Sequence, residues 1–470
     1  MPVLFIIRGI DVKILKYTLF IFLFFGPINV INAATSNVDS EFYTVLLKDA
    51  EEYEDFQKIL QNSGIEIVYS VQEVGMLQVK ANENSMKKLG VSSFVKTYGK
   101  SIRTVKSNFD YQLSIDENKI NSQWDMDKVT NNGESYKVFP GTKNVSVAII
   151  DSGLDIKHPD LKNNVLDGSK NFVPVGGFRG EELNENGERD RIDDLLGHGT
   201  QVAGQVTANG LIKGVAPGVG VKAYRVFGER EAETIWIIKA IVEAAKDNAD
   251  VINLSLGDYL LEGEYILNGK RITSDLPELE GYKRAVNLAN KSGSVVVAAA
   301  GNEGLNVRDK NQMNDFFKTY LEINGLEKVD FRGVVRDIPA DLPGVVSVSS
   351  IGNENVLSMF TNYGNGFTDI VAPGGDTRLL NQYGGEIWYK NKMYEKEHVL
   401  TTAPNGEYVY QFGNSVAAPK VSGALALIID KHNLKDNPNE SIRYLYNYGV
   451  DKEEMSLGHG ILNVYKAILH

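Results

Sequence analysis

The later part of this sequence is built from short apolar segments that alternate with helical stretches. The segments are rich in Val, Ile and Ala, as in VSVAIID (145–151), DVINLSL (250–256), SVVVAAA (294–300) and GVVSVSS (344–350). Strands of this kind are typical of parallel sheets that are covered by helices on both faces. We therefore predict a doubly wound α/β domain with a mostly parallel sheet over residues 123–470. Sites in such folds lie where strands end.

A different pattern precedes this domain. Between Glu41 and about Lys100, apolar residues recur with periods of 2 and 3.6 and predict the order β-α-β-β-α-β. That order is typical of a small ferredoxin-like α+β domain, which we assign to residues 35–100. Residues 101–122 are rich in Ser, Asn, Asp and Lys, so we expect an exposed linker that is open to proteolysis.

Residues 1–34 have the layout of a secretory signal peptide. Arg8, Lys13 and Lys16 precede an apolar stretch from Tyr17, and small residues follow. An uncleaved membrane anchor is the alternative, because Tyr17 to Ala34 is nearly apolar. In both cases we expect the rest of the chain to lie outside the cell. We see no C-terminal sorting motif, which favours free secretion over attachment to the cell wall.

Composition excludes several classes of function. The absence of cysteine excludes disulfides, thiolate catalysis and Cys-based zinc sites. The net charge of -12, without a cluster of Lys and Arg, argues against nucleic acid as a partner. Basic peptides are more compatible with an acidic protein.

Three polar residues lie where predicted elements begin or end. Asp151 ends the strand VSVAIID, in an apolar setting where a carboxylate needs a partner. His198 lies between two glycines at a helix start, where the ring can approach other backbone closely. Ser415 opens an apolar helix, and Pro419 leaves the carbonyl four residues earlier without its helical donor. Each residue alone is also compatible with a turn, a packed histidine or an N-cap.

Together these motifs resemble those of the subtilisin-like serine proteases. D-S-G, G-H-G-T and G-N-S-x-A-A-P occur in the order Asp, His, Ser, and IKGVAPG, NLSLG, AAAGNEG, LPGVVSVSS, FTNYG and DIVAPGG agree with them. The resemblance covers about residues 123–470 and implies a subtilisin-like fold. It implies that Ser415 is the nucleophile, that His198 is the general base and acid, and that Asp151 orients the imidazole.

The resemblance also implies the surroundings of the nucleophile. The Asn302 amide would stabilise the oxyanion together with the Ser415 N–H. Ser255, Leu256 and Gly257 would pair with an extended peptide substrate. One departure is Asn414, which stands where the family usually has threonine, so altered efficiency is expected.

The first domain would then be a propeptide, which assists folding and inhibits the protease until it is removed. The linker near 101–122 is the expected region of self-processing. Within the family, the segments at 122–138, 224–228 and 413–431 look like those of the lantibiotic leader peptidases. Such enzymes remove the leader of a lanthipeptide precursor, typically after arginine. A secreted protease of broad specificity is the alternative.

An arginine pocket requires acidic residues, and several carboxylates follow the predicted site segments. Asp258 is our first candidate, because it follows the substrate strand, and Glu303 is the second. Replacement of a charge-paired residue of this kind should lower cleavage after Arg selectively. Three further glutamates lie in the loop after YRVF: Glu229, Glu231 and Glu233.

Metal ions are not required for the chemistry that the resemblance implies. The acidic loop Gly177 to Asp194 is predicted to be mobile and solvated, with a structural calcium site as the alternative. A metal hydrolase could use His158 and Asp160 beside the Asp151 and His198 pair, but no H-E-x-x-H motif supports it. A non-catalytic envelope protein that binds peptides is the third hypothesis.

Overall fold

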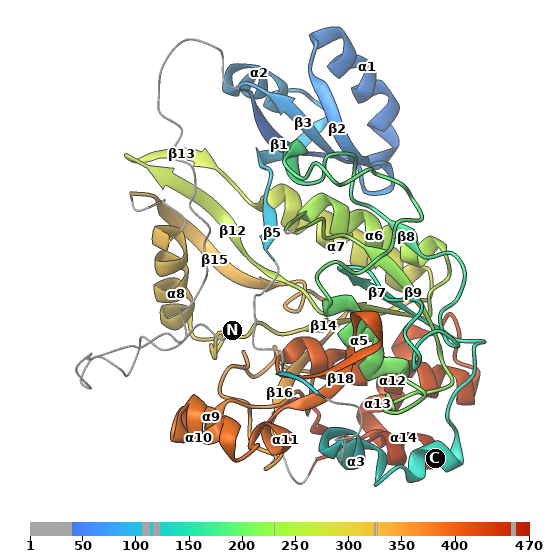
Figure 1. Ribbon diagram of the computed structural model, residues 1–470. Helices are drawn as coiled ribbons and strands as arrows, with labels where there is room; N and C mark the ends of the chain where they lie inside the picture. Colours follow the sequence, from blue (N-terminus) through green and yellow to red (C-terminus); the bar gives the residue numbers. More distant parts are fainter. Residues whose placement is uncertain are drawn as a thin grey trace.

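The computed structural model describes residues 40–105, 113–115, 123–229, 231–323, 326, 328–452 and 457–470. The expected signal segment lies outside these residues. A small domain formed by the first described segment is attached to a much larger α/β domain (Figure 1). Among the described residues, no helix is both long and apolar enough to cross a membrane.

A nine-stranded sheet forms the centre of the large domain. Its strand order is β20-β21-β17-β16-β14-β11-β7-β9-β8, and the pairs from β21 to β8 are parallel. The central strands are β7 (Ser146–Asp151), β11 (Val251–Leu254), β14 (Val295–Ala299) and β16 (Val345–Ile351). The outer strands are β8 (Lys170–Asn171), β9 (Gly220–Arg225), β17 (Ile370–Pro373), β20 (Val450–Asp451) and β21 (Ile461–Leu462).

Helices cover both faces of this sheet, which confirms the mostly parallel, doubly wound prediction. Val147 and Ile149 pack with α5 (His198–Thr207) and α12 (Asn414–His432) in one core. Ala148 and Ile150 pack with α6 (Thr234–Lys246) and α7 (Leu276–Lys291) in the other core. Successive side chains of a strand point to opposite faces, so strands buried on both sides show no polar alternation.

The small domain follows the predicted order β-α-β-β-α-β. Its elements are β1 (Glu41–Leu47), α1 (Tyr53–Ser63), β2 (Glu66–Val71), β3 (Met76–Ala81), α2 (Glu83–Gly90) and β4 (Val95–Lys100). The strands form an antiparallel sheet in the order β2-β3-β1-β4. This sheet lies against α6 and α7, so the two helices separate it from the large sheet (Figure 1).

Two short strands of the linker pair with the large domain. β5 (Arg103–Val105) is antiparallel to β10 (Glu231–Glu233), and β6 (Leu113–Ser114) is antiparallel to β19 (Glu407–Gln411). Ser101 and Thr104 are buried. The prediction of an exposed linker is therefore wrong for these two residues, because the start of the linker forms a two-stranded sheet with β10.

Several elements of the large domain have no counterpart in the sequence prediction. An arm consists of β12 (Asp258–Leu267), β13 (Lys270–Thr273), β15 (Asp330–Ile338) and the nearby α8 (Lys310–Ile323). Further elements are α3 (Trp124–Thr130), α4 (Glu134–Val138), α9 (Arg378–Tyr383), α10 (Gly385–Lys390), α11 (Tyr394–Glu397), β18 (Val399–Ala403), α13 (Pro438–Tyr448) and α14 (Val464–Leu469).

The segment that begins at Gln123 is fixed to the large domain at two points. The Gln123 side chain accepts from the Lys213 N–H (2.8 Å) and donates to the Lys213 carbonyl (2.9 Å). Asp125 forms an ion pair with Lys420 of α12 (2.9 Å), and both side chains are fully buried.

Candidate active site

Asp151 and His198 form a buried pair at the carboxyl edge of the sheet. The His198 Nδ1 lies 2.8 and 2.9 Å from the two carboxylate oxygens of Asp151, which ends β7. His198 begins α5, directly after Gly197 with a φ of 81°. On its other side, a Cβ on Gly199 would come within 2.1 Å of the Gly153 carbonyl oxygen. Both neighbours of His198 therefore need to be glycine, as the sequence suggested.

Ser415 lies in the first turn of α12 and is nearly buried. Pro419 of the same helix has no N–H, so the Ser415 carbonyl has no helical donor. That carbonyl accepts a hydrogen bond from the Ser255 hydroxyl instead (2.8 Å). Ser255 directly follows β11, which pairs with β7 so that Leu254 lies beside Ile150. The three predicted residues thus share one edge of the sheet.

The hydroxyl of Ser415 is close to this edge but is not bonded to the imidazole. Within the described ranges, no hydrogen bond joins Ser415 to His198. Catalytic hydrogen bonds are often long in free enzymes and shorten when substrate binds. Helices α5 and α12 pack against each other, which keeps the two side chains on neighbouring elements.

Asn302 is oriented by Asn414, the residue before Ser415. The Oδ1 of Asn302 accepts from the Asn414 backbone N–H (2.9 Å) and from its Nδ2 (3.1 Å). The Nδ2 of Asn414 also donates to the Gly301 carbonyl (2.7 Å), and its Oδ1 accepts from Thr361 (2.8 Å). Both contacts between the two asparagines use Oδ1 of Asn302, so the NH₂ group of Asn302 takes no part in them. Asn414 therefore makes its local contacts through an amide group, whereas the usual threonine of the family would offer a hydroxyl.

The predicted substrate strand leads into the arm. Leu256 is partly buried against the core, whereas Gly257 is exposed. Asp258, which begins β12, accepts a hydrogen bond from Thr104 of the linker strand (2.5 Å). Burial raises the pKa of the Asp258 carboxyl to about 8. The structure therefore brings Asp258 to the linker strand β5.

A second acidic residue beside Asn302 was not predicted from the sequence. Asp337 of β15 pairs in register with Tyr259 and accepts from the Gly301 N–H and from Asn362 (2.9 Å each). Glu303 is bonded to the Tyr259 hydroxyl. Burial raises the pKa of Asp337 to about 6. Asp337 was missed because no sequence pattern predicted β15.

Much of the acidic loop between Gly177 and Asp194 is exposed, as predicted, but Glu185 and Asp194 are buried. Glu185 forms a fully buried ion pair with Arg225 of β9 (2.6 Å). Asp194 accepts from the Ser152 hydroxyl (2.7 Å) and from backbone N–H groups, including that of Gly197 (2.8 Å). Since protein donors already engage these carboxylates, they do not fit a calcium site. The prediction of a mobile loop is wrong for these side chains.

The three glutamates after YRVF differ in their surroundings. Glu229 binds Asn184, and Glu231 forms an ion pair with Arg103 of β5 (3.2 Å). Glu233 is buried and pairs with Arg179 (3.1 Å).

His158 and Asp160 are also engaged by protein groups. His158 is fully buried and lies 3.1 Å from the Glu407 carbonyl, while Asp160 accepts from the Ile212 N–H (2.9 Å). The described part of the chain contains no group of three or more His, Asp or Glu side chains suited to hold a metal.

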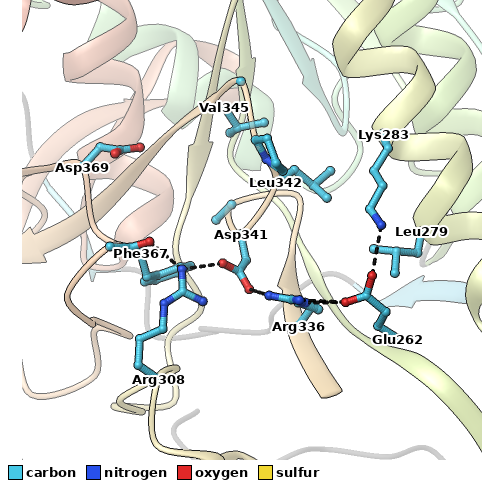
Figure 2. A pocket seen from close by; sticks show the side chains of 14 residues that line it. Glu262, Leu279, Lys283, Arg308, Arg336, Asp341, Leu342, Val345, Phe367 and Asp369 are labelled. Carbon is cyan, nitrogen blue, oxygen red and sulfur yellow. Dashed lines mark hydrogen bonds and ion pairs between the residues drawn. The ribbon is translucent and has the colours of Figure 1, made fainter. Parts of the chain in front are cut away.

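A cavity of about 470 Å³ lies beside the arm (Figure 2). Five of its charged side chains form a continuous row of ion pairs, with Asp341 between Arg308 (2.8 Å) and Arg336 (3.2 Å). Arg336 also binds Glu262 (2.7 Å), which binds Lys283 (3.1 Å). The row connects β12 and β15 of the arm to α7, which carries Lys283.

This edge of the sheet belongs to a serine protease. Residues 142–457 match the Subtilase family, Peptidase_S8, and the chain belongs to that family. Serine proteases of this family need no cofactor for their chemistry.

Relatives extend this assignment. The chain is 39% identical over 447 residues to the epidermin leader peptide-processing serine protease EpiP of Staphylococcus epidermidis, covering 92% of this chain and 94% of that protein. It is 45% identical to the nisin leader peptide-processing serine protease NisP of Lactococcus lactis subsp. lactis, over 73% of this chain and 48% of that protein. A crystal structure of EpiP from Staphylococcus aureus matches with a TM-score of 0.81 at 40% identity, over 91% of this chain and 98% of that one.

Proposed function

We propose that this subtilase hydrolyses peptide bonds through Asp151, His198 and Ser415. The observation that carries the proposal is the pairing of His198 Nδ1 with the buried Asp151 carboxylate, at the sheet edge that also holds Ser415. With Nδ1–H donated to Asp151, the Nε2 of His198 is left as the base.

In this mechanism Ser415 Oγ attacks the carbonyl carbon of the peptide bond while its proton passes to Nε2 of His198. The carbonyl oxygen becomes an anion that the Asn302 NH₂ and the Ser415 N–H stabilise. The proton on Nε2 then moves to the leaving amine as the C–N bond breaks. Water, activated by the same imidazole, hydrolyses the acyl-enzyme and restores Ser415.

Replacement of Ser415 by Ala tests this assignment. In a well-studied member of this same family, loss of the nucleophile alone lowers kcat about 2 × 10⁶-fold. We expect a similar loss for Ser415→Ala, with an unchanged Tm, measured with a fluorogenic peptide. A Ser415→Ala protein that still cleaves the peptide would refute the assignment.

We further propose that the substrate is a lanthipeptide precursor whose leader is removed after arginine. The similarity to EpiP and NisP, both named for leader processing, supports this substrate class. Asp337 and Glu303 are better candidates than Asp258 for binding the arginine, because they lie beside Gly301 and Asn302 whereas Asp258 contacts Thr104.

Mass spectrometry of a candidate precursor tests this substrate class. We expect one cut, after the arginine that precedes the core peptide, whereas many cuts would favour a protease of broad specificity. Asp337→Asn should lower kcat/KM for an Arg peptide about tenfold or more, relative to a peptide with a neutral residue there. Equal losses for both peptides would exclude Asp337 from arginine recognition.

The small domain, residues 35–100, is proposed to be a ferredoxin-like propeptide that inhibits the protease until the linker is cut. Its sheet order and its contact with α6 and α7 support this role. Secretion through the signal segment, residues 1–34, is part of the same proposal. N-terminal sequencing of the secreted protein would test both cuts.

A further inference from the structure

The linker strand β5 is held by the large domain as an added strand. Besides the pairing of Arg103–Val105 with Glu231–Glu233, the Thr234 N–H donates to the Ile102 carbonyl (3.2 Å). Main-chain bonds of this kind hold an extended peptide without regard to its sequence. Any selectivity must therefore come from the side chains that β5 presents.

Thr104 makes the most specific of these contacts. Its hydroxyl donates to Asp258 Oδ2 (2.5 Å) and lies 3.3 Å from the Thr234 hydroxyl, and the residue is only 1% exposed. A hydroxyl can donate to the carboxylate and accept from Thr234 at the same time. An apolar side chain of the same shape would leave the Asp258 carboxyl group without this hydrogen-bond partner.

The neighbouring residue makes a weaker contact. Arg103 forms an ion pair with Glu231 at 3.2 Å, and its side chain is 36% exposed. Exposed ion pairs contribute little because water and salt screen them. Selection at this position should therefore be smaller than at Thr104.

We propose that β5 occupies the groove in which the peptide substrate binds, and that Asp258 and Thr234 select a hydroxylated side chain, Thr or Ser, at the position of Thr104. This inference rests on the proposed protease function and specifies its substrate. Asp258 is thus a specificity-determining residue at some distance from the bond that is cut. A basic side chain at the preceding position is favoured by Glu231.

The test uses the full-length protein after its own processing, with synthetic peptides that span residues 100–122. One peptide has the natural sequence, and the others carry Thr104→Val or Thr104→Ser. We expect kcat/KM to be at least about tenfold lower for the Val peptide than for the natural one. If the peptides compete without being cut, the inhibition constant of the Val peptide should be at least about tenfold higher. The Ser peptide should behave like the natural one.

Enzyme variants provide the matched controls. Asp258→Ala should remove the difference between the Thr and Val peptides, whereas Asp258→Asn, which keeps an oxygen acceptor, should retain part of it. For an Arg103→Gln peptide, kcat/KM should fall only about two- to threefold relative to the natural peptide. The enzyme variant Glu231→Gln should remove this difference between the two peptides. A melting curve verifies that each variant is folded.

The outcomes separate this inference from the proposed function. Equal values for the Thr and Val peptides, or a natural peptide that is neither cut nor competitive, would overturn the selection by Asp258 while leaving the protease intact. A protein that neither processes itself nor differs from Ser415→Ala on any peptide would instead refute the protease function.

Discussion

Helices α6 and α7 contact two sheets, and the two contacts differ in chemistry. Toward the large sheet they pack against apolar residues such as Ile252 and Val296, all fully buried. Toward the small domain, the buried surface includes carboxyl groups. Glu278 of α7 is 1% exposed, and neither of its oxygens makes a hydrogen bond of normal geometry.

The carboxyl groups on this side influence one another. Burial raises the pKa of Glu278 well above its usual value; Thr44 of β1 acts against this rise, and the neighbouring Asp275 adds to it. Glu233 has a pKa raised to about 7 by burial, against which Arg179 acts. A buried carboxyl without partners is more stable in water, so these carboxyl groups oppose docking of the small domain. Apolar residues of the small domain, such as Leu46 and Met76, are buried in the same contact and favour docking.

The largest effect on stability is expected from a change in the apolar contact that α6 and α7 make with the large sheet. Ile252→Ala should lower the free energy of unfolding of the large domain by about 2 to 5 kcal/mol, because it leaves a cavity in the core. Leu46→Ala, in β1 of the small domain, is the matched control, since Leu46 is also fully buried in the same core. Calorimetry of the uncut Ser415→Ala protein should show a lower Tm of the large domain for Ile252→Ala only. Equal shifts of that transition would mean that the contacts do not differ.

A smaller effect is expected at the start of α12, where buried polar groups are fully bonded. Asn414→Ala would remove the side-chain bonds to Gly301 and Asn302 while keeping the backbone N–H. Loss of an oxyanion donor in this same family costs about 2.7 to 4 kcal/mol. Since Asn414→Ala would only misorient Asn302, the proposed donor, we expect kcat to fall about 10- to 100-fold with little change in KM. Asn414→Thr, the usual family residue, should retain more activity than Ala. A change confined to KM would contradict this positioning role.

The most gradual effect, spread over several pH units, is expected at the carboxyl contact between the small domain and α6 and α7. For Glu233, a pKa of about 7 against 4.5 means that the separated state releases a proton that the docked state retains, so docking weakens as pH rises from about 4.5 to 7. Each such carboxyl contributes up to about 1.4 kcal/mol per pH unit in that window. The first thermal transition of uncut Ser415→Ala protein should therefore fall between pH 5 and 8. Glu278→Gln should reduce this slope, and an unchanged slope would exclude Glu278 as a cause.

The sequence was sufficient to predict the central strands and the residues at their ends. Val, Ile and Ala without polar alternation indicated β7, β11, β14 and β16, and glycines around His198 indicated a close backbone approach. The arm could not be predicted, because DYLLEGEYIL and DFRGVVRDI are far apart in the chain and only their pairing makes them a sheet. Asp337 was missed with it.

Buried charges were the second limit of the sequence. Glu185 and Arg225 are separated by a long stretch of chain, and each looks like a surface residue until the fold brings them together. Thr104 was misjudged for the same reason, since a polar linker gives no sign that one of its hydroxyls will face Asp258.

The contacts of Gln123 and Asp125 limit the effect that a cut earlier in the chain can have on the large domain. Because Gln123 bonds to both main-chain groups of Lys213 and Asp125 pairs with Lys420 of α12, a new terminus created before them would leave these contacts in place. A chain without a single cysteine thus relies on hydrogen bonds and a buried ion pair, and not on a disulfide, to hold this end of the large domain.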